Sequence, residues 1–459
     1  MKRLPATRPF PSVLVMRPVM VLAVLLLAPL APAHAQFGFG QAVGGISIDA
    51  AGIVRNLEPG AVESLAKQRR EALAKTGGQT GEASTLRKVS LGRVAAALAA
   101  AAKGEAPLPA EVLFLGGLER ITHVFVDPEG RDIILAGPAD AMAVDAAGNV
   151  VAARSGRPLL QLEDLIVAMR AIDRARDGGM RCSIDPTPEG VARVQQFLKT
   201  QVAIGDPDAT LRRMEDLLGP QQVSVGGVPA DSRFARVLVA ADYRLKRLGM
   251  GLEPSGVTGL PSYVSMLPAS APAAATMPRF WLEASYDPIA RDADELAWRI
   301  TGRRMTCLTE SDLFGRDGAR RGAGGADPTA TRWCEMFSRH YDDLAAKQPV
   351  FAELVNCVDL AVVAALIHGR QLDRRANLDL ALLLDPAAVR VPSYDAPATV
   401  PTVASGMKRG NRWVVTASGG VQFQPWQFAS AEGTTTADLE TSRGEALAAR
   451  PGADRCWWD

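Results

Sequence analysis

A hairpin block near the middle of the N-terminal half constrains the fold most. The run Ile121–Val126 enters the turn sequence Asp127–Gly130, and a second run, Asp132–Ala136, returns from it. Two strand-like runs joined by a short turn that contains Pro and Gly are typical of two antiparallel strands. The sequence therefore predicts an antiparallel sheet in this part of the chain.

The same kind of turn occurs twice more. Asp49–Val54 and Asp145–Val150 both begin with Asp-Ala-Ala-Gly inside a strand-like alternation, which predicts one hairpin at each place. Either a small unit is duplicated, or two independent hairpins use the same turn chemistry. A last hairpin is expected from Arg412–Val415 and Val421–Gln424, with Gly419 and Gly420 in its turn.

Helical patterns are interspersed with these hairpins. The expected helices are Glu58–Lys75, Ser84–Lys103, Leu160–Ala175, Asp185–Lys199, Asp208–Leu218, Asp231–Leu248, Thr329–Lys347 and Pro349–Gly369. Because hairpins and helices mix without a steady strand–helix–strand rhythm, we expect an α+β fold of two packed domains.

Composition shifts divide the 459 residues further. We expect a signal peptide at 1–35, an N-terminal α+β region with hairpins at 36–205, and a second α+β region at 206–385. A Pro-rich connector and terminal hairpin follow at 386–430, and a polar, mobile tail occupies 431–459. Within that tail, the apolar Cys456–Trp458 is able to pack onto a surface.

The first 35 residues have the order of segments that an export signal needs. The basic residues Lys2, Arg3, Arg8 and Arg17 come first, and an apolar run from Val19 to Ala31 and the small residues around His34 follow. We expect cleavage after Ala35 and a periplasmic or extracellular location. The alternative is an uncleaved N-terminal anchor.

The rest of the chain predicts a protein with no membrane span once the signal is removed. Its most apolar stretch, Val358–Ile367, is interrupted by Asp359 and has the length of a core helix. The 51 basic and 50 acidic side chains are too balanced for a nucleic-acid binder that relies on a basic face.

The cysteines indicate neither a metal site nor a redox motif. There are five, Cys182, Cys307, Cys334, Cys357 and Cys456, and no two are spaced C-x-x-C. They are either isolated buried thiols or include one intrachain bridge, for which Cys307, Cys334 and Cys357 are the candidates. We expect no bound metal and no cofactor.

Sequence motifs for common catalytic sites are absent, since the chain has no P-loop, dinucleotide fingerprint, nucleophile elbow or zinc-protease helix. His340 is the best candidate for a catalytic base, but it follows Cys334 by six residues. Six residues turn a helix by roughly 600°, so the two side chains would point to different faces of one straight helix.

Acidic pairs and one basic cluster remain as weaker candidates. Glu310 with Asp312, or Asp342 with Asp343, supply carboxylates for glycoside cleavage, but nothing in the sequence brings two of them together. The loop Arg316–Arg321, with Arg303 and Arg304 upstream, is either a site for a polyanion or a solvated loop. The catalytic residues stay unknown.

A binding surface is expected on the helix of segment Asp231–Glu253. This segment carries many charged and aromatic side chains, and we select Arg233, Asp242 and Tyr243 as its binding residues. The alternative is a helix with a charged, solvated face.

Several stretches together resemble one family. They are Ile121–Gly130, Leu135–Ala139, Ser155–Pro158, Gly227–Ala235, Ala241–Arg244, Leu248–Glu253, Cys307–Glu310 and Ala417–Val421. With these stretches the chain resembles the domain-of-unknown-function 1598 family (DUF1598), exported proteins of planctomycete bacteria. The resemblance implies export and a shared fold. It implies no catalytic residues, because the family has no assigned activity.

These observations lead to one expected function and one alternative. We expect an uncharacterised exported protein of the cell envelope, with a non-catalytic binding or structural role and an envelope protein or polymer as its partner. The alternative is a hydrolase that acts on an envelope polymer with carboxylates or His340.

Overall fold

The computed structural model describes most of the chain beyond the first 42 residues. The described residues are 43–57, individual positions between 63 and 74, 81–146, 148–200, 206–268, 275–276, 278–309, 327–409, 412–414, 417–452 and 455–459. All of them belong to one compact unit, Ala35–Asp459. The expected helix Glu58–Lys75 lies largely outside the described residues, as does the expected signal peptide.

One six-stranded sheet joins segments that are far apart in the sequence, in the order β14-β11-β18-β8-β9-β15. Its strands are β8 (Met180–Asp185), β9 (Gln221–Gly226), β11 (Arg279–Ser285), β14 (Arg304–Thr309), β15 (Thr399–Val400) and β18 (Ser418–Phe423). Only the pair β11–β18 is parallel, and the other neighbours are antiparallel.

A second six-stranded sheet contains the hairpin that the turn Asp127–Gly130 predicted. Its order is β12-β13-β4-β5-β3-β19, and all of its pairs are antiparallel. Its strands are β3 (Ser84–Ser90), β4 (His123–Asp127), β5 (Asp132–Ala139), β12 (Ala290–Arg291), β13 (Ala297–Arg299) and β19 (Trp457–Trp458). The Gly130 amide donates to Asp127 Oδ1 at 2.8 Å and so fixes the turn.

The two repeated turns also form hairpins, as expected. They are β1 (Ile46–Ile48) with β2 (Val54–Asn56), and β6 (Met142–Val144) with β7 (Val150–Ala152). In the first turn Asp49 accepts hydrogen bonds from the amides of Ala51 and Ile53, both at 3.0 Å. A small three-stranded sheet has the order β10-β17-β16, with β10 (Ala275–Thr276), β16 (Ser405–Arg409) and β17 (Arg412–Val414).

The expected terminal hairpin is wrong. Strand β17 pairs with β10 and β16, whereas β18 pairs with β11 and β8, so the two predicted partners lie in different sheets. The glycine pair lies inside β18 because both neighbouring strands approach closely. A Cβ atom at Gly419 would lie 2.0 Å from the Phe280 carbonyl oxygen, and one at Gly420 would lie 1.9 Å from that of Cys182.

Helices surround and connect the sheets. They are α2 (Leu91–Ala102), α3 (Ala110–Leu113), α4 (Leu162–Ala171), α5 (Pro188–Thr200), α6 (Pro207–Leu218), α7 (Arg233–Gly249), α8 (Tyr263–Met266), α9 (Pro328–Arg339), α10 (Tyr341–Lys347), α11 (Pro349–Gly369), α12 (Leu372–Arg375), α13 (Ala381–Leu384), α14 (Pro425–Ser430) and α15 (Asp438–Ala448). Two 3₁₀ turns, η1 (Leu115–Gly117) and η2 (Arg174–Asp177), complete the elements.

Two expected helices are divided in the structure. Ser84–Ser90 is a strand, and α2 begins only after Ser90, whose hydroxyl caps the helix by accepting from the Arg93 amide at 3.0 Å. The apolar residues of this segment, Leu86 and Val89, are three apart as in a helix, and the buried face of the strand is instead formed by Arg87 and Val89, so the charge of Arg87 hides the strand pattern. Thr329–Lys347 contains two helices, α9 and α10, which meet at His340.

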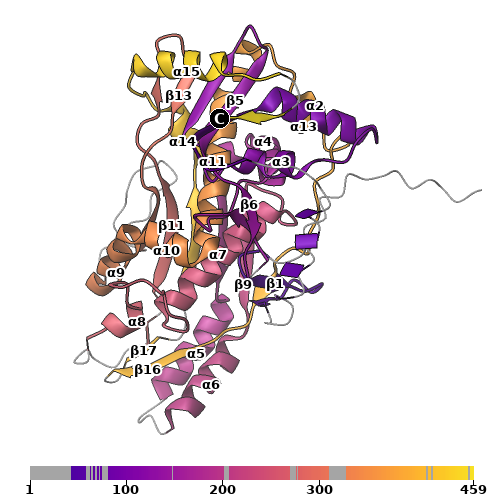
Figure 1. The fold of residues 1–459 in the computed structure, drawn as a ribbon. Coiled ribbons are helices and arrows are strands. Elements are labelled where there is room, and N and C mark those ends of the chain that lie inside the picture. Colours follow the sequence, from indigo (N-terminus) through magenta and orange to yellow (C-terminus); the bar gives the residue numbers. More distant parts are fainter. Residues whose placement is uncertain are drawn as a thin grey trace, which may run out of the picture. The chain divides into compact units, whose positions relative to one another are not determined.

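Helix α11 forms the centre of the fold. Every residue from Val350 to Ile367 is buried, and the helix packs against α4, α7, α10 and α14 and also touches β14. Figure 1 shows α4, α11 and α7 in the middle of the view. In the described part of the chain, α11 alone is long and apolar enough to cross a membrane by length and composition, and as a fully buried helix it fits a core position.

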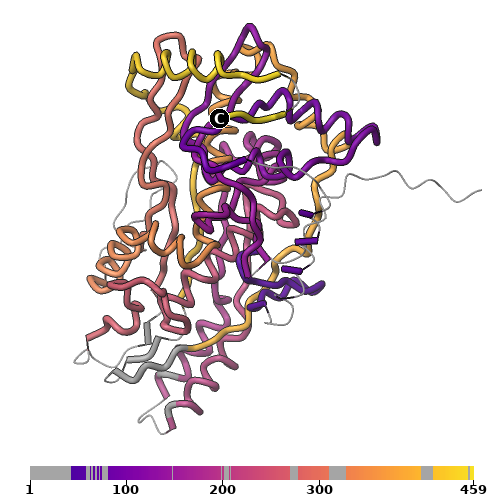
Figure 2. The backbone as a smooth tube through the Cα atoms, viewed as in Figure 1, coloured from indigo at the N-terminus to yellow at the C-terminus, as the bar shows by residue number. Residues whose placement is uncertain are grey.

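The C-terminal segment, for which composition predicted a mobile tail, carries α15 and β19 in the structure. Strand β19 pairs with β3, so the last residues lie beside Lys88 and Val89, far away in the sequence (Figure 2). The Trp458 indole donates to the Ala446 carbonyl oxygen at 2.9 Å, and Arg87 stacks over Trp457 at 4.2 Å. The apolar stretch Cys456–Trp458 therefore packs onto the protein surface, as its sequence allowed.

The fold class predicted from the sequence, α+β, is confirmed by this mixture of helices and largely antiparallel sheets. The boundaries proposed at residues 205, 385 and 430 stay predictions.

Candidate functional site

Arg233, the first of the three predicted binding residues, lies in the interior. It follows the N-cap Ser232 and so begins α7. Its guanidinium pairs with Asp164 of α4 and donates to Glu353 of α11 at 3.0 Å, while Glu163 lies 3.9 Å away. One cation therefore connects three helices through three carboxylates.

In this cluster three carboxylates face one guanidinium, and the pKa values of Asp164 and Arg233 are both shifted. Burial raises the pKa of Asp164, although Arg233 opposes this. Burial would by itself lower the pKa of Arg233, but Asp164, Glu353 and Glu163 together raise it. The Tyr394 hydroxyl donates a hydrogen bond to the Glu163 carboxylate at 3.0 Å, which gives this carboxylate a second partner. The arrangement holds α4, α7 and α11 together, and Arg233 is the cation on which it depends.

We predict that Arg233→Met lowers the free energy of unfolding by about 3–5 kcal/mol, because it leaves buried carboxylates without their cation. Urea unfolding of the purified protein measures this. The matched control is Arg212→Met on the exposed surface of α6, which should change stability by less than about 0.5 kcal/mol. Equal effects of the two substitutions would contradict the role given to Arg233.

Asp242, the second predicted binding residue, is completely buried. It accepts a hydrogen bond from the Lys246 ammonium at 2.8 Å, one turn further along α7. Lys246 also donates to the carbonyl oxygens of Ile184 and Gly419, at 2.6 and 3.2 Å. The pair therefore attaches α7 to strands β8 and β18. Burial raises the pKa of Asp242 from 3.8 to about 7, with Lys246 opposing and Asp185 adding to the rise.

This raised pKa predicts a pH-dependent stability. Folded Asp242 keeps a proton in the range where the unfolded carboxyl has lost it, so its contribution to stability falls as the pH rises from 4 toward 7. Relative to Asp242→Asn, the wild type should lose about 2 kcal/mol of unfolding free energy between about pH 5 and 7. Urea unfolding at several pH values tests this, and parallel pH curves for the two proteins would refute it.

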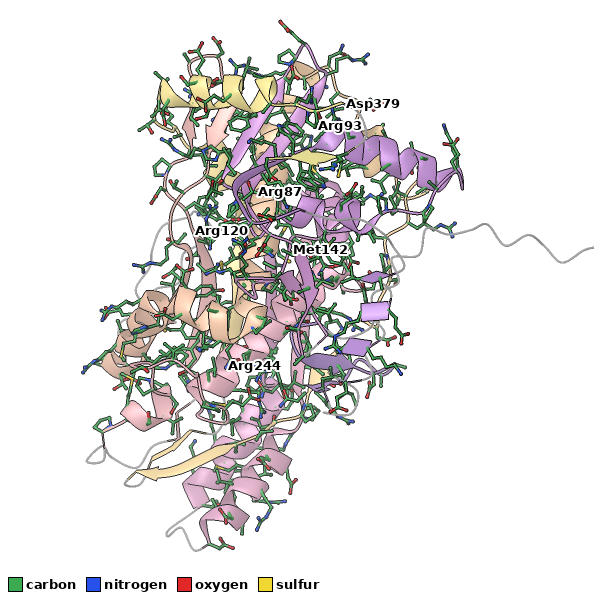
Figure 3. All side chains as sticks on the ribbon, viewed as in Figure 1. Arg87, Arg93, Arg120, Met142, Arg244 and Asp379 are labelled. Atoms are coloured by element: carbon green, nitrogen blue, oxygen red, sulfur yellow. The ribbon has the colours of Figure 1, made fainter. Side chains whose placement is uncertain are left out.

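Tyr243, the third predicted binding residue, is half-buried and lies at the edge of a surface cluster. Arg247 packs over its ring at 5.4 Å and donates to Glu253 at 2.5 Å. Arg244, labelled in Figure 3, pairs with the same carboxylate. The structure thus separates the three residues: Arg233 and Asp242 stay inside, and only Tyr243 reaches toward the surface. Their role in binding stays a prediction.

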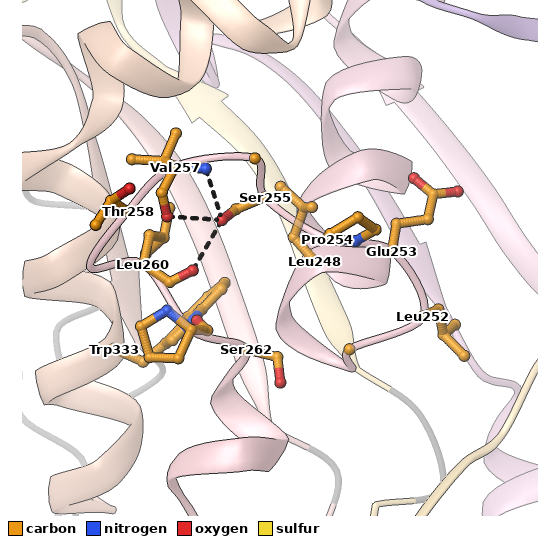
Figure 4. Close-up of a pocket in the computed structure, with 13 residues that line it drawn as sticks. Leu248, Leu252, Glu253, Pro254, Ser255, Val257, Thr258, Leu260, Ser262 and Trp333 are labelled. Carbon is orange, nitrogen blue, oxygen red and sulfur yellow. Dashed lines mark hydrogen bonds between the residues drawn. The ribbon is translucent and has the colours of Figure 1, made fainter.

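Beyond Glu253 the chain forms a surface pocket of about 610 Å³ (Figure 4). Its wall consists of the C-terminal end of α7, the loop 251–262 and Trp333 of α9. Three glycines of the loop, Gly251, Gly256 and Gly259, have positive φ angles of 70°, 73° and 86°, which the loop needs in order to curve back on itself.

Hydrogen bonds fix the walls of this pocket. The Ser255 hydroxyl donates to the Leu260 carbonyl oxygen at 2.8 Å and accepts from the Val257 amide at 3.2 Å (Figure 4). On the other side, the Trp333 indole donates to the Pro261 carbonyl oxygen at 2.9 Å. Gln348, between α10 and α11, donates to the Pro254 carbonyl oxygen at 3.2 Å. The pocket is therefore preformed rather than dependent on a ligand.

The lining chemistry suits an uncharged ligand. Leucines, a valine, prolines and Trp333 alternate with the hydroxyl-bearing residues Ser255, Thr258 and Ser262. Glu253, the one ionisable side chain among the described residues that line the pocket, is already paired with Arg244 and Arg247. Such a wall offers apolar contact and hydrogen bonds but no net negative charge.

The residues considered for catalysis are not among the lining residues of this pocket, although His340 lies against its loop, with Nε2 3.4 Å from the position of a Cβ atom at Gly259. His340 Nδ1 lies 3.2 Å from the exposed Asp343, and His368 Nδ1 lies 3.2 Å from Asp173. Asp342 and Asp343 are both largely exposed. Glu310, Asp312 and the loop 316–321 lie outside the described residues. Among the residues that the structure places, no group of three or more His, Cys, Asp or Glu has the geometry of a metal site.

All five cysteines are described and buried, and none is in a disulfide. Two of them meet: Cys307 of β14 and Cys334 of α9 have their Sγ atoms 3.3 Å apart. The sequence left Cys307, Cys334 and Cys357 as the candidates for one intrachain disulfide. In the structure Cys357 instead lies beside Asp164 and Arg233, which leaves the first two as the adjacent pair.

Comparison with known proteins finds one family match, over part of the chain. A family model described as a protein of unknown function (DUF1598) matches residues 182–263. The matched segment runs from β8 through α7 and includes the pocket loop, and it supports the resemblance to this family. No curated protein and no solved structure matches the chain.

Proposed function

We propose that the protein is an exported, non-catalytic binding protein of the cell envelope, as expected for DUF1598 proteins of planctomycete bacteria. The observation that carries the proposal is the preformed pocket of loop 251–262, which lies in the segment that matches the family. We propose further that it takes an uncharged stretch of an envelope protein, whose apolar side chain contacts the partly exposed Leu252, Pro254 and Val257.

The hydrolase alternative has weaker support from the described residues. Its base, His340, bonds to a surface carboxylate, and the pocket wall contributes hydroxyls and apolar groups instead of an acid pair. Binding is therefore the function that this geometry supports best.

A photo-crosslinking amino acid at Thr258 tests the binding proposal in the full chain, expressed in its own cells. We expect one dominant crosslinked envelope protein, and we expect Leu252→Trp, which fills the pocket, to reduce the crosslink at least about tenfold. An unchanged thermal midpoint of Leu252→Trp shows that the fold is intact. The control position is Lys103, an exposed residue at the end of α2. The same products from both positions, or a crosslink insensitive to Leu252→Trp, would overturn the proposal.

Export predicts a further chemical change. In an oxidising compartment, a thiol oxidant of the envelope should remove two electrons and two protons from Cys307 and Cys334 and join them in a disulfide. Mass spectrometry of peptides from protein trapped with an alkylating agent should show this pair joined, with Cys182 and Cys357 still reduced. Alkylation of both Cys307 and Cys334 in freshly trapped protein would contradict it.

A further inference from the structure

A second pocket, of about 480 Å³, lies at one end of the strands β3, β4 and β13, where Thr85, His123 and Arg299 line it. Four of its lining residues are ionisable, and all four are basic types: Arg120, His123, Arg299 and Arg304. Thr85, Thr122 and Thr301 add hydroxyls. No carboxylate belongs to the lining that the described residues form. The chemistry of this pocket is therefore different from that of the pocket at loop 251–262.

The basic side chains are neutralised to different degrees. Arg304 is buried and donates to Asp359 at 2.9 Å. Arg299 lies 2.5 Å from Asp438, which is mostly exposed. Among the described residues, the ion-pair partner of Arg120, labelled in Figure 3, is Asp342 at 3.9 Å, and this exposed carboxylate also lies 3.7 Å from Arg157. A solvent-exposed pair at 3.9 Å is weak, so Arg120 keeps most of its positive charge. Arg299 is paired closely with Asp438, and an anion in the pocket would compete with this exposed carboxylate for the guanidinium.

The turn that carries Arg304 is held in an uncommon backbone conformation. Gly302 has φ 113° and Arg304 has φ 75°, a left-handed value that a long side chain rarely adopts. A Cβ atom at Gly302 would lie 2.5 Å from the Asp287 amide nitrogen. This turn keeps the Arg304 guanidinium in the floor of the pocket, where its Nε makes no hydrogen bond to any described residue. Conformations of this kind persist where the surrounding structure requires them.

We propose that this pocket binds an oxyanion, a carboxylate or phosphate group, between Arg120 and Arg299. Both guanidiniums offer donors in a planar fork that matches two oxygens of such a group. The buried Arg304 adds positive charge from below, and the exposed hydroxyls of Thr85 and Thr301 can donate to a remaining oxygen, whereas the Thr122 hydroxyl already contacts His123 and Ala136.

His123 supports this assignment and gives it a spectroscopic signal. Burial and the neighbouring Arg299 lower the pKa of His123 to about 4, with Asp438 opposing. The ring is therefore neutral near pH 7, with its Nδ1 atom 3.0 Å from the Thr122 hydroxyl oxygen. An oxyanion between Arg120 and Arg299 would offset the repulsion from Arg299, so its binding should raise the pKa of His123.

Titration of the purified protein with inorganic phosphate, and separately with acetate, tests the proposal by calorimetry and by NMR of the His123 ring. We expect saturable binding of at least one of the two, with a rise in the His123 pKa. If only phosphate binds, the natural ligand carries a phosphate group, and if only acetate binds, it carries a carboxylate. Binding of both indicates an oxyanion site without preference. Absence of binding of either at millimolar concentration would overturn the proposal.

Matched variants locate the site. Arg120→Gln and Arg299→Gln should each weaken binding at least about tenfold, as expected for loss of a charge-assisted bond. The control Arg212→Gln, an exposed residue of α6 outside the pocket lining, should leave anion binding unchanged. Unaltered thermal midpoints exclude unfolding as the cause. Binding that is equally insensitive to all three substitutions would place the anion elsewhere and refute the assignment.

Discussion

A single buried carboxylate, Asp359, joins the central helix to both large sheets. It lies in the middle of α11 and is completely buried. It accepts hydrogen bonds from Arg304 at 2.9 Å, from the Tyr286 hydroxyl at 2.6 Å and from the Ile121 amide at 3.2 Å. Arg304 begins β14 of one sheet, and Ile121 precedes β4 of the other. A buried carboxyl in such an apolar helix is tolerated only because these partners surround it.

Both pockets depend on α11 and its neighbours, but in different ways. In the basic pocket, which Arg120, His123, Arg299 and Arg304 line, hydrogen bonds to Asp359 and to the Ile300 carbonyl oxygen, the latter at 2.8 Å, hold the Arg304 guanidinium in the floor. The pocket at loop 251–262 depends on α9, where Trp333 packs on Phe280 with ring centroids 4.5 Å apart. At the other end of the core, Glu353 of α11 is held by Arg233 in the same manner as Asp359 by Arg304. Each carboxylate of α11 thus has a guanidinium from another element.

Local patterns in the sequence predicted the local structure well and the long-range structure poorly. The hairpin at Asp127–Gly130 and helix α11 follow from turn residues and apolar runs, which act over a few residues. The position of β18 between β8 and β11 depends on partners more than 100 positions away, so its glycines looked like a turn. Arg233 and Asp242 looked like surface residues because charge predicts exposure, and their buried partners lie on other elements. The Gly- and Pro-rich loop 251–262 did carry a signal for a structured loop.

A double-mutant cycle of Asp359→Asn and Arg304→Met most directly tests the claim that this pair organises the core. The unfolding free energies of the wild type, both single variants and the double variant are measured in urea. We predict a coupling energy of at least about 1.5 kcal/mol, with the double variant less destabilised than the sum of the singles, because the second change removes the charge that the first left unpaired. Additive effects within about 0.5 kcal/mol would contradict the account.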